Sequence, residues 1–409
     1  MSSLANTVAL DEVDPARSRH AGRRSAVALG SDAVVVGTAA GTVRAFDRDP
    51  LAERWRATPA PGREEDPSVV SAVICEGTVI VGERSATGHV RGYDLATGEL
   101  SFRYATADDI GAPAEETRFF LPFVVDIRTD GDRAYVAARR YERDGGDRSF
   151  ESVIHALDPE GTVRWRYQTD ASPISLDAAG DRLAVAYNRC PGEYQHGLVL
   201  LDANTGSERW HWDPGTDGQR RVGDVSLLAD GLALTSHGDY RGYRLDPGGA
   251  IRWRVDLATP REIGGETLYA YPNHVHASDH GVAFVTGNTY AEQGRDTDGL
   301  HPDEHTVFGY APAGGQRWKA DIGGFAHGLA ADADRIAVPS AQHFRSRDPD
   351  DHGLSTFDIG DGPLQATETD GIVTATAVDG NGVVGVEEPV SYHDDDRTHG
   401  RYRLHAQPV

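Results

Sequence analysis

The stretch LLDANTGSERWHW, residues 200–212, decides the fold because the chain repeats it with an Asp, a Gly and a Trp at nearly fixed offsets. Related stretches begin at Ala45, Gly92, Ala156, Arg244 and Gly309, and two weaker ones begin at Thr356 and Arg403. The third residue of the eight copies is Asp47, Asp94, Asp158, Asp202, Asp246, Ala311, Asp358 and His405, at intervals of 44 to 65 residues. Such a period is typical of the blades of a β-propeller.

Each copy is preceded by an apolar strand, a tight polar turn and a second apolar strand, as in SLLADGLALTS from Ser226. Short apolar runs joined by Asp and Gly turns predict antiparallel hairpins, so each repeat supplies four strands, A to D. We therefore predict an all-β fold, an eight-bladed β-propeller of four-stranded antiparallel blades in a single domain, 1–409. The expected blades span about 22–57, 68–105, 121–169, 172–213, 223–257, 272–321, 326–368 and 372–408. The last copy has no D strand, so a strand at about 4–13 is expected to close the eighth blade and remove an exposed edge.

The three recurring residue types have separate structural roles. The Asp side chain ends strand C and accepts hydrogen bonds from the backbone N–H groups of the next turn, while the Gly supplies a positive φ. Four residues after that Gly the outer strand carries an aromatic residue, at Phe102, Trp165, Trp210, Trp253 and Trp318. A large ring at this position covers the seam between successive blades, so the aromatic residues are expected to be structural rather than ligand-binding.

The composition is strongly acidic. There are 64 acidic and 40 basic residues, a net charge of -24, and the basic residues include a single lysine, Lys319. This composition is similar to that of proteins from salt-accumulating halophiles. The charge repels nucleic acid and anionic membrane surfaces, so we expect neither as a partner. We expect a monomer that binds a protein or a small molecule.

Targeting signals and cysteine chemistry give little indication of export. The stretch RRSAVALGSDAVVVG from Arg23 resembles a twin-arginine signal, but Asp32 interrupts its apolar run and the segment matches the strand pairs of the other repeats. No run approaches the roughly 20 apolar residues that cross a bilayer. Cys75 and Cys190 form no CxxC motif or adjacent pair, which indicates neither a disulfide framework nor a thiolate metal site. We expect a cytoplasmic protein.

The D-x-x-T-G motif followed by an outer-strand aromatic residue, at Asp94 to Phe102 and Asp202 to Trp210, carries a family resemblance. It resembles the pyrroloquinoline-quinone-like propeller repeat of quinoprotein alcohol dehydrogenases and of BamB-type outer-membrane assembly lipoproteins, both eight-bladed. In the quinoprotein enzymes the resemblance implies a calcium ion, a catalytic Asp and an adjacent cysteine pair. Cys75 and Cys190 do not match that pair and no position matches the calcium ligands, so pyrroloquinoline quinone is not expected as a cofactor. No lipobox matches the BamB-type lipoproteins either.

Long insertions distinguish the two rims of the predicted propeller. The A-to-B and C-to-D turns are all short, whereas the B-to-C and D-to-A connections hold the insertions at about 105–121, 138–151, 187–197, 287–305, 340–353 and 387–400. Because strand direction alternates, these insertions share one face. Extended loops gathered on one rim are typical of a functional face, so we place the binding region there, around the central channel.

Histidines accumulate on this face. The stretch YPNHVHAS puts His274 and His276 at the start of an innermost strand with both side chains on one side, and His327 holds the matching place in the next blade. With a carboxylate such as Asp224 or Glu387, these three imidazoles are candidate ligands of a divalent transition metal. The remaining candidate ligand-binding residues at strand starts and loop ends are Arg23, Arg24, Asp224, His237, Asn273, His343 and His393; His305 also lies at a loop end.

Two hypotheses of function follow. The first is a non-catalytic binding or interaction scaffold that holds a protein or small ligand on the long-loop face. The alternative is a metal-dependent enzyme, a lyase or hydrolase, with a histidine-coordinated divalent metal at the channel mouth. The acidic stretches at Asp296–Gly299 and His393–His399 lack the ligand spacing of a calcium loop, and no nucleophile motif is present.

Overall fold

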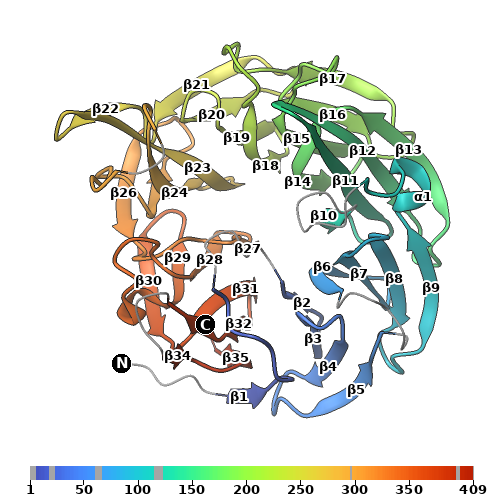
Figure 1. Cartoon of the computed structure of the whole chain (residues 1–409). Helices are drawn as coiled ribbons and strands as arrows, with labels where there is room; N and C mark the ends of the chain where they lie inside the picture. The colour runs from blue at the N-terminus through green and yellow to red at the C-terminus, as the bar shows by residue number, and fades with distance from the viewer. Residues whose placement is uncertain are drawn as a thin grey trace. The chain divides into compact units, whose positions relative to one another are not determined.

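The computed structural model describes residues 6–17, 24–59, 67–114, 123–294, 297–392 and 397–408 (Figure 1). These residues fall into two compact units. The N-terminal unit holds the described residues within 6–13 and 23–213, and the C-terminal unit holds those within 14–22 and 214–409. Strands make up nearly all of the regular structure in both units, which confirms the predicted all-β class. In the described part of the chain, no helix is long and apolar enough to span a membrane.

Four successive groups of four antiparallel strands form the N-terminal unit, coloured from blue to green in Figure 1. The groups are β2 (Ala26–Leu29), β3 (Ala33–Gly37), β4 (Val43–Asp47) and β5 (Glu53–Ala57); β6 (Ser68–Cys75), β7 (Thr78–Arg84), β8 (His89–Asp94) and β9 (Leu100–Ala105); β10 (Phe123–Thr129), β11 (Ala134–Asp144), β12 (Asp147–Leu157) and β13 (Val163–Thr169); β14 (Ser172–Ala179), β15 (Arg182–Arg189), β16 (Leu198–Asp202) and β17 (Glu208–Trp212). This unit also contains β1 (Asn6–Ala9) and the short helix α1 (Ala107–Ile110). A single pair, Phe123 with Arg84, joins the second and third groups.

The C-terminal unit repeats the same arrangement. Its groups are β18 (Val222–Leu228), β19 (Gly231–Ser236), β20 (Arg241–Leu245) and β21 (Ile251–Asp256); β23 (Glu266–Ser278), β24 (Gly281–Ala291), β25 (Thr306–Tyr310) and β26 (Gln316–Asp321), extended by β22 (Arg261–Ile263); β27 (Ala330–Asp332), β28 (Arg335–Ser340), β29 (Gly353–Asp358) and β30 (Gly362–Glu368); and β31 (Ile372–Asp379), β32 (Gly382–Glu388) and β35 (Arg403–Gln407). The small hairpin of β33 (Val390–Ser391) and β34 (Thr398–His399) and the 3₁₀ turn η1 (Pro349–Asp351) complete it.

The burial pattern shows why the strands take this order. All five residues of β3 are buried, as are the first four of β16, so both faces of these middle strands are covered. The fourth strands, such as β13, alternate between half-buried and exposed residues and therefore carry one solvent-facing side. Middle strands rich in Val, Leu and Ala bury their side chains between neighbouring sheets, as stacked four-stranded sheets require.

The Asp of the repeat makes the predicted turn. Asp202 Oδ1 accepts hydrogen bonds from the backbone N–H groups of Asn204 at 3.0 Å and Thr205 at 3.1 Å, and Gly206 has φ 71°. Arg209 donates to Asp202 Oδ2 at 2.6 Å, and this hydrogen bond holds the pKa of Asp202 below its ordinary value. The roles predicted for the Asp and the Gly are confirmed here.

Five of the outer-strand aromatic residues contact the next repeat, as predicted, and they give its Gly a second function. Trp165 Nε1 donates to the Ala203 carbonyl at 3.0 Å, and a Cβ atom on Gly206 would lie 2.6 Å from Trp165 Cδ2. Any other residue at 206 would therefore clash with the ring as well as strain the backbone. The same contact joins Trp55 to Gly98, Phe102 to Gly161, Trp253 to Gly314 and Trp318 to Gly362.

The strand register corrects the last copy of the repeat. Gln407 pairs with Val383, just as Leu245 pairs with Leu232 and Tyr310 with Val282 at the ends of the third strands. The residue equivalent to Asp246 and Ala311 is therefore Pro408 rather than His405, which lies inside β35 opposite Gly385. The expected alignment depended on the Arg-Leu pair at 403–404, because this copy has no Asp-Gly turn to fix it.

Candidate metal centre and adjoining pocket

Two long connections of the C-terminal unit build the candidate site: the one from β24 to β25 and the one from β28 to β29. Both were predicted as insertions, at 287–305 and 340–353. The first begins later than expected, because β24 continues to Ala291 and pairs there with Leu268 of the 13-residue strand β23. This long hairpin carries Asn288 and Thr289 to the side of the connection that bears Glu304 and His305.

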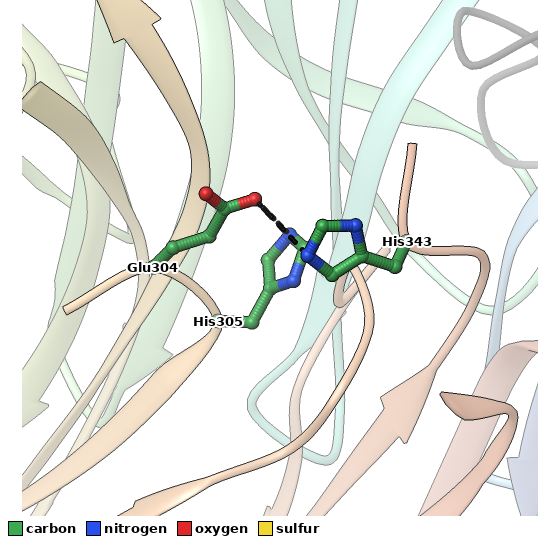
Figure 2. A group of neighbouring side chains, drawn as sticks. All are labelled: Glu304, His305 and His343. Carbon is green, nitrogen blue, oxygen red and sulfur yellow. Dashed lines mark ion pairs between the residues drawn. The ribbon is translucent and has the colours of Figure 1, made fainter. Parts of the chain in front are cut away.

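Glu304, His305 and His343 bring three potential metal ligands together (Figure 2). Glu304 Oε1 lies 3.5 Å from His305 Nε2 and 3.7 Å from His343 Nε2, and all three ligand atoms lie within 4.8 Å of one another. The two imidazole rings meet edge to face, with their centroids 4.9 Å apart. Among the described residues, this is where three histidine, cysteine or carboxylate ligand atoms converge.

His305 is held in one orientation. Its side chain is 2% exposed and its backbone has φ 44°, a left-handed conformation that a non-glycine residue adopts at a cost. Nδ1 donates to the Gly323 carbonyl at 3.2 Å, which leaves the lone pair on Nε2, 2.9 Å from Asn288 Oδ1. Burial, followed by the neighbouring His343, lowers the pKa of His305 to about 3, so the ring is neutral at physiological pH.

Glu304 and His343 are also fixed by neighbouring groups. The Thr289 hydroxyl donates to Glu304 Oε2, so Oε1 is the oxygen that faces the imidazoles. His343 Nδ1 accepts from the backbone N–H groups of Arg345 and Ser346, both at 3.2 Å. Nδ1 is therefore unprotonated as the side chains lie, and Nε2 carries the proton that faces Glu304.

A pocket of about 630 Å³ adjoins this group, with Glu304 in its wall. Side chains of both charge signs and two aromatic rings line it: Glu266, Asn288, Thr289, Tyr290, Thr297, Asp298, Glu304, Phe344, Arg345 and Arg347. Arg345 braces the wall by donating to the carbonyls of Gly299 and Thr289. The volume and the mixture of aromatic and polar groups are typical of a small-ligand site.

Four of the sequence candidates lie together around the second half of β23. The sequence placed His274 and His276 at the start of this strand, but β23 already begins at Glu266. His274 Nδ1 is 3.7 Å from Asp224 Oδ2, and His237 interacts electrostatically with His274 and hydrogen-bonds to Asn273. Burial, then the charges of Arg220 and His274, lower the pKa of His237 to about 3. His237, Asn273, His274 and Asp224 thus form one cluster.

Asp224 has a structural role that the sequence analysis did not identify. It accepts from Val225 N at 2.9 Å and from Val275 N at 2.9 Å, which joins β18 to β23. In the N-terminal unit, Asp126 accepts in the same way from Ile127 N and Leu176 N. The repetition of this bridge indicates that Asp224 links successive inner strands.

The three histidines expected to bind a metal do not form a three-donor group within the described ranges. His274 Nε2 donates to the Ala326 carbonyl at 3.1 Å and His276 Nε2 donates to the Ala333 carbonyl at 2.8 Å. Each of these bonds engages one ring nitrogen only, so what separates these histidines from the Glu304 group is that their donor atoms do not converge with a third one. His327 packs against Phe325, with ring centroids 5.0 Å apart.

The remaining candidates are placed separately. His343 joins the Glu304 group, and Arg24 is half-buried in the N-terminal unit. Arg23 and His393 lie outside the described residues. Sequence reasoning missed Glu304 and Asn288; the available signal was the Glu-His pair at the end of an insertion, one repeat before His343.

Comparisons with known proteins support the fold. The sequence profile of the family described as outer membrane protein assembly factor BamB matches residues 39–231 and 149–260. A quinohemoprotein alcohol dehydrogenase of Comamonas testosteroni is 26% identical over 216 residues, which span 50% of this chain and only 28% of the dehydrogenase. BamB from Moraxella catarrhalis has a similar structure, with a TM-score of 0.60, 14% identity, and coverage of 100% of this chain and 99% of BamB.

A quinohemoprotein alcohol dehydrogenase from Pseudomonas putida HK5 is also similar in structure, with a TM-score of 0.62, 11% identity, and coverage of 98% of this chain and 75% of that chain. Together these likenesses show a propeller-like all-β fold with multiple four-stranded antiparallel sheets, like that of BamB.

The quinone cofactor of the dehydrogenases does not fit the described residues. Cys75 and Cys190 are buried and form no disulfide. Cys75 Sγ donates to the Gly131 carbonyl and Cys190 Sγ to the His196 carbonyl, so they do not form an adjacent pair. The converging donor group contains two imidazoles, whereas calcium prefers oxygen ligands alone.

Proposed function

Because the chain belongs to the family described as outer membrane protein assembly factor BamB, we propose that it is a binding scaffold built as an eight-bladed propeller in one domain. The binding region lies in the insertion loops of the C-terminal unit, and its ligand carries both charge signs, as a short peptide does. The observation that carries this proposal is the pocket of about 630 Å³ beside Glu304. We also propose that the protein is a cytoplasmic monomer that binds neither nucleic acid nor membranes.

The lining of the pocket supports this class of ligand. Arg345 and Arg347 suit a carboxylate, Glu266 and Asp298 suit an ammonium group, and Tyr290 supplies an aromatic wall. The volume lies within the range of about 300–1,000 Å³ that is typical of small-molecule sites. A scaffold of this kind would hold the end of a partner chain or a free peptide.

The pocket predicts peptide binding by the full chain. In isothermal titration calorimetry with a pool of dipeptides and tripeptides, we expect binding that weakens at least about tenfold in Tyr290→Ala and in Arg347→Ala, because each removes part of the pocket wall. Arg252→Ala, which changes an exposed arginine of β21 paired with Asp230, is the matched control and should bind like the wild type. Absence of binding, or equal binding by all three variants, would refute the proposed ligand class.

Closure of the propeller by the N-terminal segment is a further part of the proposal. Within the N-terminal unit, Arg56 Nη1 binds Asp11 Oδ1 at 2.8 Å and Arg44 Nη1 donates to the Ala9 carbonyl at 3.3 Å, so residues 6–13 are attached to β4 and β5. Deletion of residues 1–13 is expected to lower the melting temperature markedly, because it removes these contacts and exposes a sheet edge. Differential scanning calorimetry measures this, and an unchanged transition would contradict closure.

A metal-dependent lyase or hydrolase is the second candidate function, and the Glu304, His305 and His343 group is the observation that favours it. A divalent ion held there would act as a Lewis acid toward a ligand in the pocket. Hydrolysis of p-nitrophenyl esters by the zinc-loaded chain, with its loss in Glu304→Gln, would support an enzyme. Equal background rates for both proteins would favour the scaffold.

A further inference from the structure

We propose that Glu304, His305 and His343, together with the side-chain oxygen of Asn288, bind one divalent transition-metal ion. The metal-dependent function proposed above rests on this site. The site itself does not depend on peptide binding in the pocket. This site differs from the one predicted from the sequence at His274, His276 and His327, and it lies in the same unit.

The distances between the donors suit a small ion. Ligands about 2.0–2.1 Å from a tetrahedral ion lie about 3.3–3.4 Å from one another. Glu304 Oε1 is 3.5 Å from His305 Nε2 and 3.7 Å from His343 Nε2, within a few tenths of an ångström of this separation. All three donor atoms lie within 4.8 Å of one another, so the two imidazoles move toward each other when the ion binds. Asn288 Oδ1, 2.9 Å from His305 Nε2, lies closer than the tetrahedral separation and takes a fourth position by moving outward by a few tenths of an ångström.

The neighbouring groups prepare the ligands for a cation. The His305 Nδ1–H bond to the Gly323 carbonyl turns the Nε2 lone pair inward, and the Thr289 hydroxyl orients the Glu304 carboxylate. Hydrogen bonds of this type from neighbours that do not touch the ion are a regular feature of metal sites. His305 Nε2 and Asn288 Oδ1 are both acceptors that face each other, and both residues are buried, so a positive ion between them satisfies both.

The donor types select the class of metal. Two imidazoles with a carboxylate and an amide oxygen suit zinc, iron(II), cobalt(II) or manganese(II), whereas calcium and magnesium prefer oxygen ligands alone. Zinc and cobalt(II) are therefore suitable probes, and cobalt(II) also reports the coordination geometry through its visible absorption.

Metal binding must change the tautomer of His343. Nε2 gives up the proton that now faces Glu304, and Nδ1 takes one up, so the ring keeps its net charge. A protonated Nδ1 no longer accepts from the N–H groups of Arg345 and Ser346. The turn at 343–347 must therefore shift, and it carries both arginines that line the pocket.

The test uses the full chain after chelator treatment and dialysis. Titration with cobalt(II), followed by visible absorption, and with zinc, followed by elemental analysis, should give one ion per chain for the wild type. Affinity should fall at least about tenfold in Glu304→Gln, which keeps the shape of the side chain, and in His343→Ala. His280→Ala, an exposed histidine paired with Asp334, is the matched control and should bind like the wild type.

Two further measurements separate a ligand role from a purely structural one. Thr289→Val should weaken zinc binding about 10–100-fold while leaving the four ligands in place. Hydrogen exchange at the amides of Arg345 and Ser346 should change on zinc addition in the wild type but not in His343→Ala. The metal site is refuted if the wild type takes up no ion, or if Glu304→Gln and His343→Ala bind the ion as tightly as His280→Ala does. In that case the side-chain amide of Asn288 donates a hydrogen bond to His305 Nε2. Peptide titration of the metal-free chain tests the scaffold separately.

Discussion

Replacement of Trp318 by alanine is expected to lower the free energy of unfolding by about 2–3 kcal/mol, below the cost of about 3–5 kcal/mol for a fully buried aromatic side chain, because Trp318 is half-buried. Trp318 stacks on Phe357 with ring centroids 5.6 Å apart and an interplanar angle of 1°, and its Nε1 donates to the Ile359 carbonyl at 3.0 Å. It also lies over Gly362 in the next turn. Its removal leaves a cavity between two sheets of the C-terminal unit.

Urea denaturation monitored by circular dichroism, together with calorimetry, measures this loss. Leu364→Ala is the matched control, because Leu364 lies on β30 of the same unit with 51% of its surface exposed, and its replacement should cost less than about 0.5 kcal/mol. Trp318→Phe keeps a ring over Gly362 and should fall between the two. A Trp318→Ala protein as stable as Leu364→Ala would show that the ring is not structural.

Replacement of His405 by alanine is the second change expected to have a large effect, at about 3–5 kcal/mol. His405 Nε2 lies 2.5 Å from Glu387 Oε2, and both side chains are buried. Glu387 Oε1 also accepts from Gly371 N at 2.9 Å and Arg401 N at 3.1 Å. Removing the imidazole leaves a buried carboxylate without this hydrogen-bond donor, whereas removing both side chains together is expected to cost less than the sum of the two changes.

The same pair predicts a pH dependence. Burial alone would raise the pKa of Glu387, but the hydrogen bonds from His405 and Arg401 outweigh it, so the net pKa lies below the ordinary value of 4.5. Because the folded-state pKa is depressed, the carboxylate stabilises the fold at pH values above about 4.5, and this stability is lost as the pH falls through the folded-state pKa. Glu387→Gln should flatten the loss of stability in acid measured by calorimetry, whereas Glu368→Gln, at an exposed position, should follow the wild type. Parallel acid profiles for all three proteins would contradict this assignment.

The sequence predicted the features that are local and periodic. The Asp turn, the positive φ of Gly206 and the seam contact of Trp165 each depend on residues at fixed spacing within one repeat or its neighbour. The all-β class and the family resemblance follow from the same repetition. The alignment of His405 failed where that repetition was lost.

The insertions could not be predicted to the same degree, because no period fixes their register. The insertion at 138–151 was interpreted as a loop, but the structure continues β11 and β12 as a regular hairpin in which Asp144 pairs with Asp147. Charged residues on both strands obscured the alternation, although the Asp-Gly-Gly-Asp turn was visible.

The candidate site was only partly foreseen for the same reason. His343 was named and His305 was placed at a loop end, but the two lie 38 positions apart on separate connections. Their approach to Glu304 depends on the left-handed backbone of His305 and on the length of the β23–β24 hairpin. Neither feature has a signature in the local sequence.

The contact between each outer-strand ring and the following glycine affects how such a chain can diverge. In the repeat at 309–321 the Asp has been replaced by Ala311, yet Gly314 remains, with φ 91° and Trp253 Cγ 3.0 Å from its would-be Cβ. The backbone still closes the turn, because Gly314 N donates to the Ala311 carbonyl at 2.8 Å. The turn thus tolerates the loss of its aspartate. Its glycine, in contrast, is also required by the aromatic ring of the preceding repeat. We therefore expect a change at such a glycine to be tolerated only together with a change at the ring of the preceding repeat.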